Sequence, residues 1–207
     1  MTEEKSVGAR AQIRRKDRAS YDAETVYAIL DEALVAHVGF VVDGQVFVIP
    51  TTYARLGHSL IVHGGGATRL FKVLREGAPV CVTVTLLDGL VLARSAFHHS
   101  MNYRSVVVFG ETRDVTDPEE KSRALAALVE RMEPGRSSRA RAPSARELGL
   151  TCVLAIEIQD ASAKMRKGGP IDDEEDMAVD VWAGEIPLRT TRLEGIADVP
   201  AERGVIA

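Results

Sequence analysis

The sequence predicts a mainly β (α+β) fold, an antiparallel barrel with helices at its periphery. Two β-rich stretches each contain an Asp-Gly pair, Asp43-Gly44 and Asp88-Gly89, and such a pair between apolar runs favours a tight hairpin. Six or seven strand-like runs follow one another, and helical patterns interrupt them only at intervals. This order is typical of an antiparallel barrel rather than of a parallel sheet with alternating helices.

Composition describes an ordinary globular chain. Of its 207 residues, 45% are hydrophobic and 27% are charged, so 1–207 is most simply one domain with a core of its own. The net charge of −4 gives no reason to expect nucleic acid or an anionic membrane as a partner. No apolar run reaches the roughly 18 residues of a membrane span, and the polar start lacks the apolar core of a signal peptide. We therefore expect a cytoplasmic protein.

The first half of the chain predicts a helix, a hairpin and a strand that leads into a second helix. Asp22 has the side chain of an N-cap, and apolar residues then recur at helical spacing through about Ala36. Residues 38–54 contain Asp43-Gly44 and predict the first hairpin. The run 60–77 reads as a strand, three glycines and a helix, which Gly77 is expected to stop.

The second half predicts three more strand regions and one long helix. Residues 79–97 contain Asp88-Gly89 and predict a second hairpin, followed by a strand from about Tyr103 to Val115. Asp117-Pro118 begins a helix that reaches about Met132, and the basic segment 134–146 is expected to be a loop. A last strand covers Thr151 to Ile158, and the acidic run 172–176 is expected to be solvated chain. Cys81 and Cys152, both in apolar runs, are expected to be buried free thiols.

The glycine-rich turn is the strongest candidate for a ligand site. Glycines allow main-chain N–H groups to approach a ligand, the first turn of a helix leaves its N–H groups unpaired, and Arg69 can grip a phosphate. The expected ligand is a phosphorylated cofactor. A purely structural turn stays open, because the spacing matches neither GxGxxG nor the Walker pattern.

The expected barrel has consequences for ligand binding and assembly. A small barrel is filled by its own side chains, so a cofactor needs a groove on the outside. Because such grooves are often made by pairing two barrels, we expect a homodimer that binds a small-molecule substrate.

Five short motifs occur in a fixed order along the chain: IPTTY at 49–53, HGGGATR at 63–69, VCVTV at 80–84, DGLVLARS at 88–95 and HHSMNYRSV at 98–106. Together they resemble the pyridoxamine 5′-phosphate oxidase-related proteins, in particular the flavin-nucleotide-binding branch that includes the 5-nitroimidazole-resistance nitroreductases. The resemblance covers roughly 15–188. It implies an FMN-binding split β-barrel of antiparallel Greek-key topology, a homodimer with FMN at the subunit interface.

The resemblance also implies the residues of the cofactor site. In this chain the phosphate would be bound by the glycine-rich turn, and the flavin would be flanked by the end of the first hairpin. The residues implied are Pro50, Thr51, Thr52 and Tyr53 beside the ring, His63, Gly64, Ala67, Thr68 and Arg69 at the phosphate, Ser95 at the ribityl chain or ring edge, and Asn102, Tyr103 and Arg104 towards the partner subunit.

The ends of the chain complete this interpretation. Residues 181–188 resemble the family's C-terminal piece, in which an aromatic residue, here Trp182, lies near the flavin. We therefore expect a C-terminal docking tail over 167–207 and a flexible N-terminus over 1–15. Tyr53 and Tyr103 could instead fill the barrel, and Trp182 could cap the core.

The five histidines suggest other chemistry, most of which the sequence argues against. Adjacent residues such as His98 and His99 point in different directions, and no Cys-x-x-Cys or His-x-x-x-His accompanies them, so no metal site is expected. Haem stays open, because some split-barrel relatives bind it. His63 before three glycines is also found in hydrolases, but the Gly-x-Ser-x-Gly elbow that they need is missing.

Two classes of function follow. The first is an FMN-dependent oxidoreductase that passes electrons to a small acceptor such as a nitro-compound or quinone. The second is a flavin- or haem-binding carrier or sensor without turnover, and a narrower variant is a reductase that uses the deazaflavin F420. Activity on pyridoxamine phosphate is not expected, because the basic residues for that substrate have no match here. No catalytic acid or base can be named from the sequence.

Overall fold

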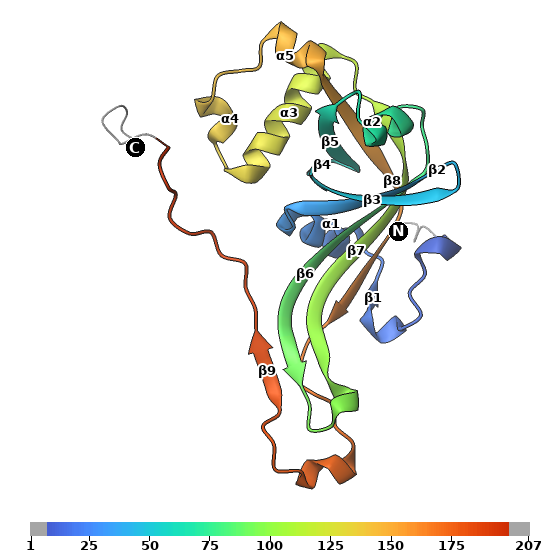
Figure 1. The fold of residues 1–207 in the computed structure, drawn as a ribbon, viewed down its shortest axis with the longest axis vertical. Coiled ribbons are helices and arrows are strands. Elements are labelled where there is room, and N and C mark those ends of the chain that lie inside the picture. The colour runs from blue at the N-terminus through green and yellow to red at the C-terminus, as the bar shows by residue number, and fades with distance from the viewer. Residues whose placement is uncertain (1–7, 199–207) are drawn as a thin grey trace, which may run out of the picture.

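One antiparallel sheet dominates the computed structural model, which describes residues 8–198 (Figure 1). Its main path has the order β3-β2-β6-β7-β8-β5-β4, while β1 pairs with β8 and β9 pairs with β6. The strands are β1 (Ala19–Ser20), β2 (Val35–Val42), β3 (Gln45–Thr52), β4 (Ala54–Leu56), β5 (Ser59–Gly65), β6 (Val80–Leu92), β7 (Ser100–Asp114), β8 (Thr151–Arg166) and β9 (Gly184–Pro187).

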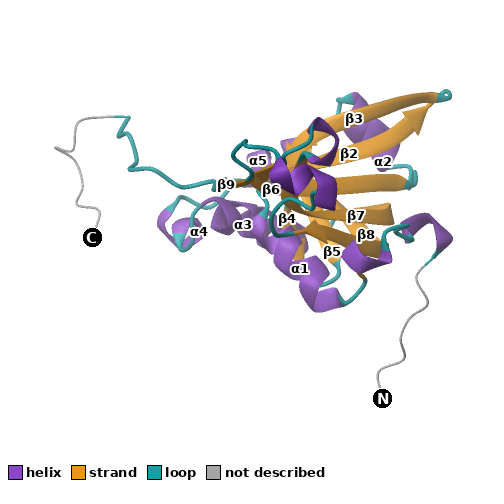
Figure 2. Cartoon of the chain, turned by 90° about the horizontal axis from the view of Figure 1, so that it is seen from below, coloured by secondary structure: helices purple, strands orange, loops and turns teal. Residues whose placement is uncertain are grey.

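The helices lie around the curved sheet (Figure 2). The α-helices are α1 (Ala23–Glu32), α2 (Arg69–Leu74), α3 (Pro118–Met132), α4 (Arg136–Arg139) and α5 (Ala145–Leu150). Four short 3₁₀ helices are also described: η1 (Ala9–Ala11), η2 (Lys16–Arg18), η3 (Ala96–His98) and η4 (Glu174–Ala178). No helix within residues 8–198 has both the length and the apolar character that a membrane crossing requires.

Three long strands divide the molecule into two regions. β6, β7 and β8 begin or end in the barrel and continue well beyond it, as the lower half of Figure 1 shows. The end of β6 in this lower half pairs with β9, from Gly89 opposite Pro187 to Leu92 opposite Gly184. We call the lower part, residues 87–104 and 164–187, the extension.

The barrel has a filled interior, with a smaller cluster outside. The interior cluster joins α1, α2 and the inward residues of β2, β5, β6, β7 and β8, with Leu30, Leu60, Val84 and Leu154 among its fully buried members. Alternating strand residues face this core, as the pleat of a strand requires. A second cluster packs α3 on the outer face of β5 and β8. A ligand therefore needs an outside surface, as the sequence predicts.

Several local predictions are confirmed. Asp22 caps α1 by accepting a hydrogen bond from the Thr25 N–H at 2.7 Å. Asp117 caps α3 in the same way, accepting from Glu120 N–H at 2.8 Å, and Pro118 begins the helix. The first hairpin turns at Asp43 and Gly44, whose φ angles of 49° and 78° suit the left-handed turn that Asp-Gly favours.

The prediction of a second hairpin at Asp88-Gly89 is wrong. β6 runs unbroken from Val80 to Leu92, and the register against β7 shifts between Leu87 and Gly89, so Asp88 sits in a bulge. The chain reverses later, between β6 and β7, around η3. β6 pairs with β7 on one side and with β9 on the other. These two partners outweigh the local turn preference of Asp-Gly.

Two other boundaries also differ from expectation. The first helix ends at Glu32 rather than near Ala36, because Ala33 is extended and Ala36 pairs with Thr51 in the sheet. The segment 134–146 is not all loop, since it contains α4 and the start of α5, whose Ser144–Glu147 capping box holds the helix start. The last two long strands are longer than predicted.

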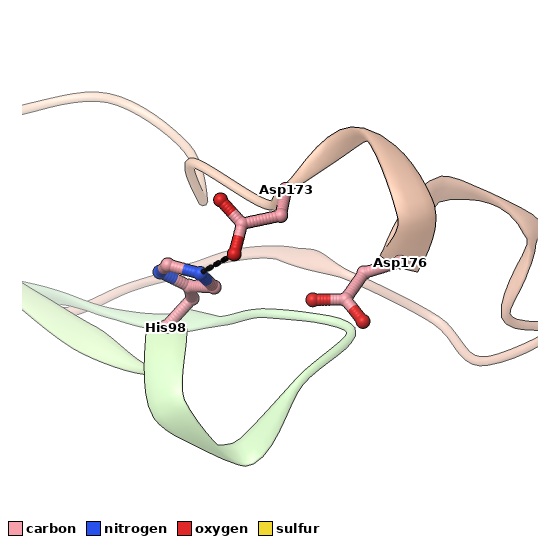
Figure 3. A group of neighbouring side chains, drawn as sticks. All are labelled: His98, Asp173 and Asp176. Carbon is pink, nitrogen blue, oxygen red and sulfur yellow. Dashed lines mark hydrogen bonds and ion pairs between the residues drawn. The ribbon is translucent and has the colours of Figure 1, made fainter.

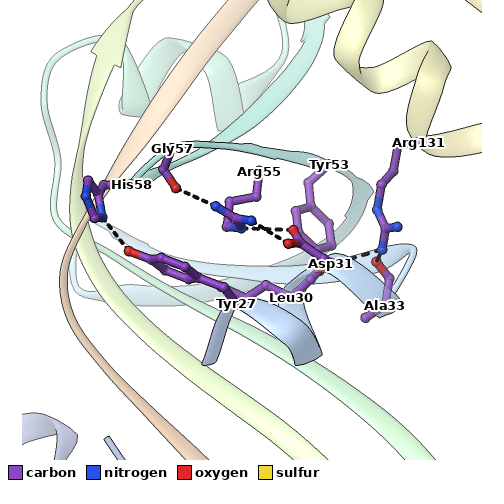
Figure 4. A network of polar contacts seen from close by, with 9 residues as sticks. All are labelled: Tyr27, Leu30, Asp31, Ala33, Tyr53, Arg55, Gly57, His58 and Arg131. Atoms are coloured by element: carbon purple, nitrogen blue, oxygen red, sulfur yellow. Dashed lines mark hydrogen bonds and ion pairs between the residues drawn. The ribbon is translucent and has the colours of Figure 1, made fainter. Parts of the chain in front are cut away.

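Polar contacts tie α1 to its neighbours (Figure 4). Arg55 of β4 donates to Asp31, with Nε 2.9 Å from Oδ1, and its guanidinium lies over the Tyr27 ring. The Tyr27 hydroxyl contacts His58 Nδ1. Arg131 of α3 donates to the Ala33 carbonyl at 2.6 Å, at the end of α1.

Candidate functional site

The glycine-rich turn connects β5 to α2 and carries two polar side chains for which residues 8–198 provide no hydrogen bond or ion pair. Thr68 is the N-cap of α2, but its hydroxyl makes no capping bond. Arg69 forms no ion pair with any side chain in residues 8–198, and its guanidinium lies 4.4 Å from the centroid of the Phe47 ring on β3. Thr68, Arg69 and Ala67 are exposed, so both polar groups are free to meet a ligand.

His63 and Gly64 precede this turn and are half-buried. The Nδ1 atom of His63 is buried and has no hydrogen-bond partner within the described chain. Burial lowers the pKa of His63 below its ordinary value, which favours the neutral ring. Gly64 is required by packing, because a Cβ there would lie 2.5 Å from the Phe71 ring. The structure thus gives Gly64 a packing role beside any ligand role.

The end of the first hairpin divides into surface and core. Pro50 and Thr52 are exposed and Thr51 is half-buried on β3. Tyr53 is fully buried, and its hydroxyl donates to the Leu30 carbonyl. Burial raises the pKa of Tyr53 above its ordinary value. Tyr53 is therefore a barrel filler, the second of its two expected roles, and its side chain offers no surface to a ligand.

Asn102 and Arg104 lie together in a groove of about 890 Å³ in the extension. Its charged lining is mainly basic: Arg15, Arg18, Arg104, Arg166 and Lys167, against Asp17, Asp88 and Glu185. Buried Asn102 donates to Glu185 at 2.7 Å and accepts from Arg166. Arg104 donates to Glu32 and to Asp88. The hydrogen bond from Arg104 holds the pKa of Glu32 below its usual range.

Sequence reasoning missed Arg166, which organises this groove. The side chain is buried, and besides Asn102 it donates to the Gly168 and Gly169 carbonyls at 2.7 and 2.8 Å. In the sequence Arg166 is visible only as a second basic residue, two positions after Lys164. The sequence does not reveal the direction of its side chain.

Ser95 lies at the far end of the extension, beside the two adjacent histidines. Its carbonyl accepts a hydrogen bond from His99 Nδ1 at 3.0 Å, which leaves His99 Nε2 directed elsewhere. His98 contacts Asp173 instead, with Nε2 3.0 Å from Oδ2 (Figure 3). The two imidazoles therefore face different partners, as expected for neighbours in sequence.

The two aromatic candidates are both accessible. The Tyr103 ring is half-buried and has Lys164 Nζ 5.8 Å from its centroid. Trp182 is 61% exposed, so it does not cap the core of this chain. Other exposed apolar side chains of the extension are Phe97, Met101, Ile171, Met177, Val179 and Val181.

The predicted residues form separate groups within one chain. The glycine-rich turn lies beside α2 in the upper half of Figure 1, whereas the end of the β6–β7 connection lies in the lower half. Among the described residues that line the groove, only Asn102 and Arg104 were predicted as site residues. Within one protomer, the residues at the glycine-rich turn and those in the groove therefore form two separate groups.

Comparison with known proteins assigns the chain to a family. The family model described as pyridoxamine 5′-phosphate oxidase matches residues 22–165, more than half of the chain. The chain belongs to this family. The resemblance inferred from the motifs is confirmed, and so is the fold class, a split β-barrel. A search of the curated proteins found no match.

Three solved structures are similar to this chain. The flavocytochrome Anf3 from Azotobacter vinelandii is 42% identical, with a TM-score of 0.87 over 96% of this chain and 92% of that one. The FAD and haem binding protein from Mycobacterium smegmatis is 36% identical, with a TM-score of 0.86 over 91% and 93%. A putative 5-nitroimidazole antibiotic resistance protein from Bacteroides thetaiotaomicron is 21% identical, with a TM-score of 0.60 over 71% and 87%, and supports the fold alone.

Proposed function

We propose that this protein is a homodimeric flavoprotein that passes electrons from reduced flavin to a small acceptor such as a nitro-compound or quinone. The observation that carries the proposal is the match to the flavocytochrome, which is 42% identical over 96% of this chain. A match of that length includes both the barrel and the extension. The name describes that relative, and the function of this chain depends on its own site residues.

The glycine-rich turn fits the phosphate of a flavin nucleotide. Thr68 offers a hydroxyl without a capping bond, and Arg69 offers a guanidinium without a carboxylate partner among residues 8–198. The Nδ1 atom of His63, near the end of β5, is buried and also lacks a hydrogen-bond partner within the described chain. Because buried polar atoms and arginines are normally paired, such a set is suited to an anionic ligand that supplies the missing acceptors.

The bound flavin would supply two-electron and one-electron transfer, and the chain's residues would bind and orient it. Pro50, Thr51 and Thr52 would contact the ring from an exposed strand end. Across a dimer interface, Asn102 and Arg104 of the partner would offer donors to a ring edge that becomes negative on reduction. Ser95, Tyr103 and Trp182 stay candidates for contacts at the same interface.

FMN is the cofactor that the motifs imply, and FAD is the one that the 36% identical relative is named for. The basic groove in the extension has five cationic side chains against three carboxylates, which suits a second, anionic portion of a larger cofactor. Titration of the apoprotein with riboflavin, FMN, FAD and F420 separates these cases. Equal affinity for riboflavin and FMN would remove the phosphate site from the turn.

Arg69→Ala tests the phosphate site directly. A charge-assisted hydrogen bond to phosphate contributes about 1.5–3 kcal/mol, so FMN or FAD affinity should fall by roughly one to two decades while riboflavin affinity is unchanged. Arg123→Ala, at an exposed position of α3, is the matched control and should bind all flavins as the wild type does. An equal loss of affinity in both variants would contradict the assignment.

Turnover is tested by reoxidation of the reduced protein. After anaerobic reduction, a nitroimidazole or quinone acceptor should reoxidise the bound flavin faster than it reoxidises free reduced flavin. If no acceptor does so and NAD(P)H fails to reduce the flavin, a carrier or sensor without turnover is the better description.

Haem is a second candidate cofactor, favoured by both relatives above 30% identity and by His99. Its Nδ1 contacts the Ser95 carbonyl, and this arrangement fixes the tautomer that leaves Nε2 able to ligate iron. Phe97 and Met101, each two residues from His99 in sequence, are exposed apolar side chains that suit a haem face. Haem added to the apoprotein should give a Soret band that His99→Ala shifts or abolishes and that His37→Ala, an exposed control on β2, leaves unchanged. Unchanged spectra in both variants would exclude His99.

A further inference from the structure

The end of the extension holds a second side-chain cluster, made by residues far apart in sequence (Figure 3). His98 belongs to η3, between β6 and β7, whereas Asp173 and Asp176 belong to the acidic run at η4. One imidazole nitrogen and one oxygen of each carboxylate lie within 4.8 Å of one another. The acidic run was expected to be plain solvated chain, so this convergence was not visible in the sequence.

We propose that His98, Asp173 and Asp176 bind a divalent first-row transition-metal ion that clamps the C-terminal segment to the β6–β7 end of the extension. The proposal does not rest on the flavin function, because none of the three residues belongs to the flavin site. It also leaves His99, the candidate haem ligand, free to face its own partner.

The distances suit an ion between the three groups. Zinc lies about 2.0–2.2 Å from imidazole nitrogen and carboxylate oxygen, so neighbouring ligand atoms around it are about 3.0–3.5 Å apart. His98 Nε2 is already 3.0 Å from Asp173 Oδ2. The Asp176 oxygen lies within 4.8 Å of both other ligand atoms, so it must move closer for all three to bind one ion.

Asp176 is available as the third ligand. Its carboxylate faces the His98 ring in Figure 3, yet it accepts no hydrogen bond and forms no ion pair with another side chain in the described part of the chain. Asp173 and Asp176 are three residues apart in η4, where the Asp176 N–H donates to the Asp173 carbonyl at 3.0 Å, and this turn places both carboxylates towards the histidine.

The two segments are held together by contacts outside the cluster. Asp172 accepts from the Arg94 main-chain N–H and from its guanidinium, both at 2.8 Å, and its side chain is 2% exposed. On the other side of η4, β9 pairs with β6. The ligands are therefore brought close before an ion arrives, which reduces the entropy that binding must overcome.

The donor set selects the class of ion. Imidazole favours zinc and other transition metals over magnesium and calcium, whereas carboxylates bind both classes. Three protein ligands leave at least one position for water, and half-buried His98 and Asp176 leave that position accessible. The neighbouring carboxylates of Glu174 and Glu175 are exposed and add negative charge that attracts the ion.

The test is calorimetric titration of the purified full-length protein, freed of bound metal by a chelator, with Zn²⁺, Mn²⁺ and Mg²⁺. We expect saturable binding of one Zn²⁺ per chain, Mn²⁺ binding that is weaker, and no saturable Mg²⁺ binding over the same concentrations. Asp176→Asn and His98→Gln should each weaken Zn²⁺ binding at least tenfold, with flavin content and circular dichroism unchanged. Glu175→Gln, the matched control from the same acidic run, should change the affinity less than twofold.

Two results would overturn the proposal. One is the absence of saturable Zn²⁺ binding, and the other is a loss in Glu175→Gln as large as in Asp176→Asn, which would mean diffuse attraction by the acidic run. A second readout detects the clamp itself. Zn²⁺ should slow limited proteolysis within 167–187 in the wild type and not in Asp176→Asn, and equal cleavage rates with and without Zn²⁺ in the wild type would contradict the clamp.

Discussion

Asp88, in the bulge of β6, accepts two hydrogen bonds from Arg104 of β7, from Nε at 3.0 Å and from Nη2 at 2.8 Å. The same guanidinium donates to Glu32, the last residue of α1. One arginine thus joins the bulge, the neighbouring strand and the helix at the point where the barrel passes into the extension. The bulge directs Asp88 towards this arginine instead of turning the chain.

Replacing Arg104 should therefore cost stability. Arg104→Met leaves Asp88 and Glu32 facing each other without their shared cation, and we expect a loss of about 1 kcal/mol in the free energy of unfolding, because the pairs are partly exposed and screened by solvent. Urea denaturation at pH 7.5 measures it. Arg141→Met, which breaks the exposed pair with Glu147, is the control and should leave the unfolding midpoint unchanged. Equal midpoints for all three proteins would show that the Arg104 network contributes nothing.

His63 should make stability depend on pH in the mildly acidic range. Its folded-state pKa is lowered by burial, so the unfolded chain, with an ordinary pKa of about 6.5, takes up the proton first as the pH falls. The stability that this group contributes is present above pH 6.5 and is lost as the pH drops through the lower folded-state pKa. His63→Phe should lose less stability than the wild type between pH 7.5 and pH 5 in urea denaturation. Parallel losses in both proteins would show that the pKa of His63 does not differ between the folded and the unfolded state.

Gly110 should be the least replaceable glycine of the sheet. It lies in the irregular register between β7 and β8, and a Cβ there would approach the Glu157 carbonyl oxygen to 2.0 Å. Gly110→Ala must shift the backbone and should cost about 1–3 kcal/mol. Gly149→Ala is the control, because that site in α5 has open space and alanine favours helix by about 0.5–1 kcal/mol. A thermal melt distinguishes them by opposite shifts, and a neutral Gly110→Ala would mean that the bulge is easily rearranged.

The sequence predicts this fold well where local chemistry and tertiary packing agree. Asp22 and Asp117 are followed by helices with apolar faces, and Asp43-Gly44 joins β2 to the edge strand β3, beyond the part of β2 that pairs with β6. Asp88-Gly89 has the same local signal, but its strand has partners on both sides. Of these partners β9 is remote in sequence, so the residues around Asp88 carry no trace of its pairing.

The candidate site is predictable by residue type but not by arrangement. The glycine-rich turn and Arg69 follow from their own neighbours in sequence. Arg166 and the set of His98, Asp173 and Asp176 depend instead on contacts between segments more than 60 residues apart. Burial of Tyr53 likewise follows from packing against Leu30, which the IPTTY motif alone does not reveal.

Dimerisation should depend on the outer face of the first hairpin. Val41, Val46 and Val48 are exposed there, Val48 by 59%, beside a shallow apolar groove that also includes Cys81. An apolar strand face of this kind is typical of an interface between subunits, since water contacts it unfavourably. Because the flavin is proposed to lie between two chains, the same association should complete its site.

We therefore expect a dimer by analytical ultracentrifugation at micromolar concentration, and a shift towards monomer in Val48→Glu, which places a charge on that face. Leu150→Glu, at an exposed position of α5 away from the hairpin, should stay dimeric. Flavin affinity should fall together with dimer content in Val48→Glu, because the proposed site uses residues from both chains. A wild-type monomer that binds one flavin per chain would contradict both the dimer and the shared site.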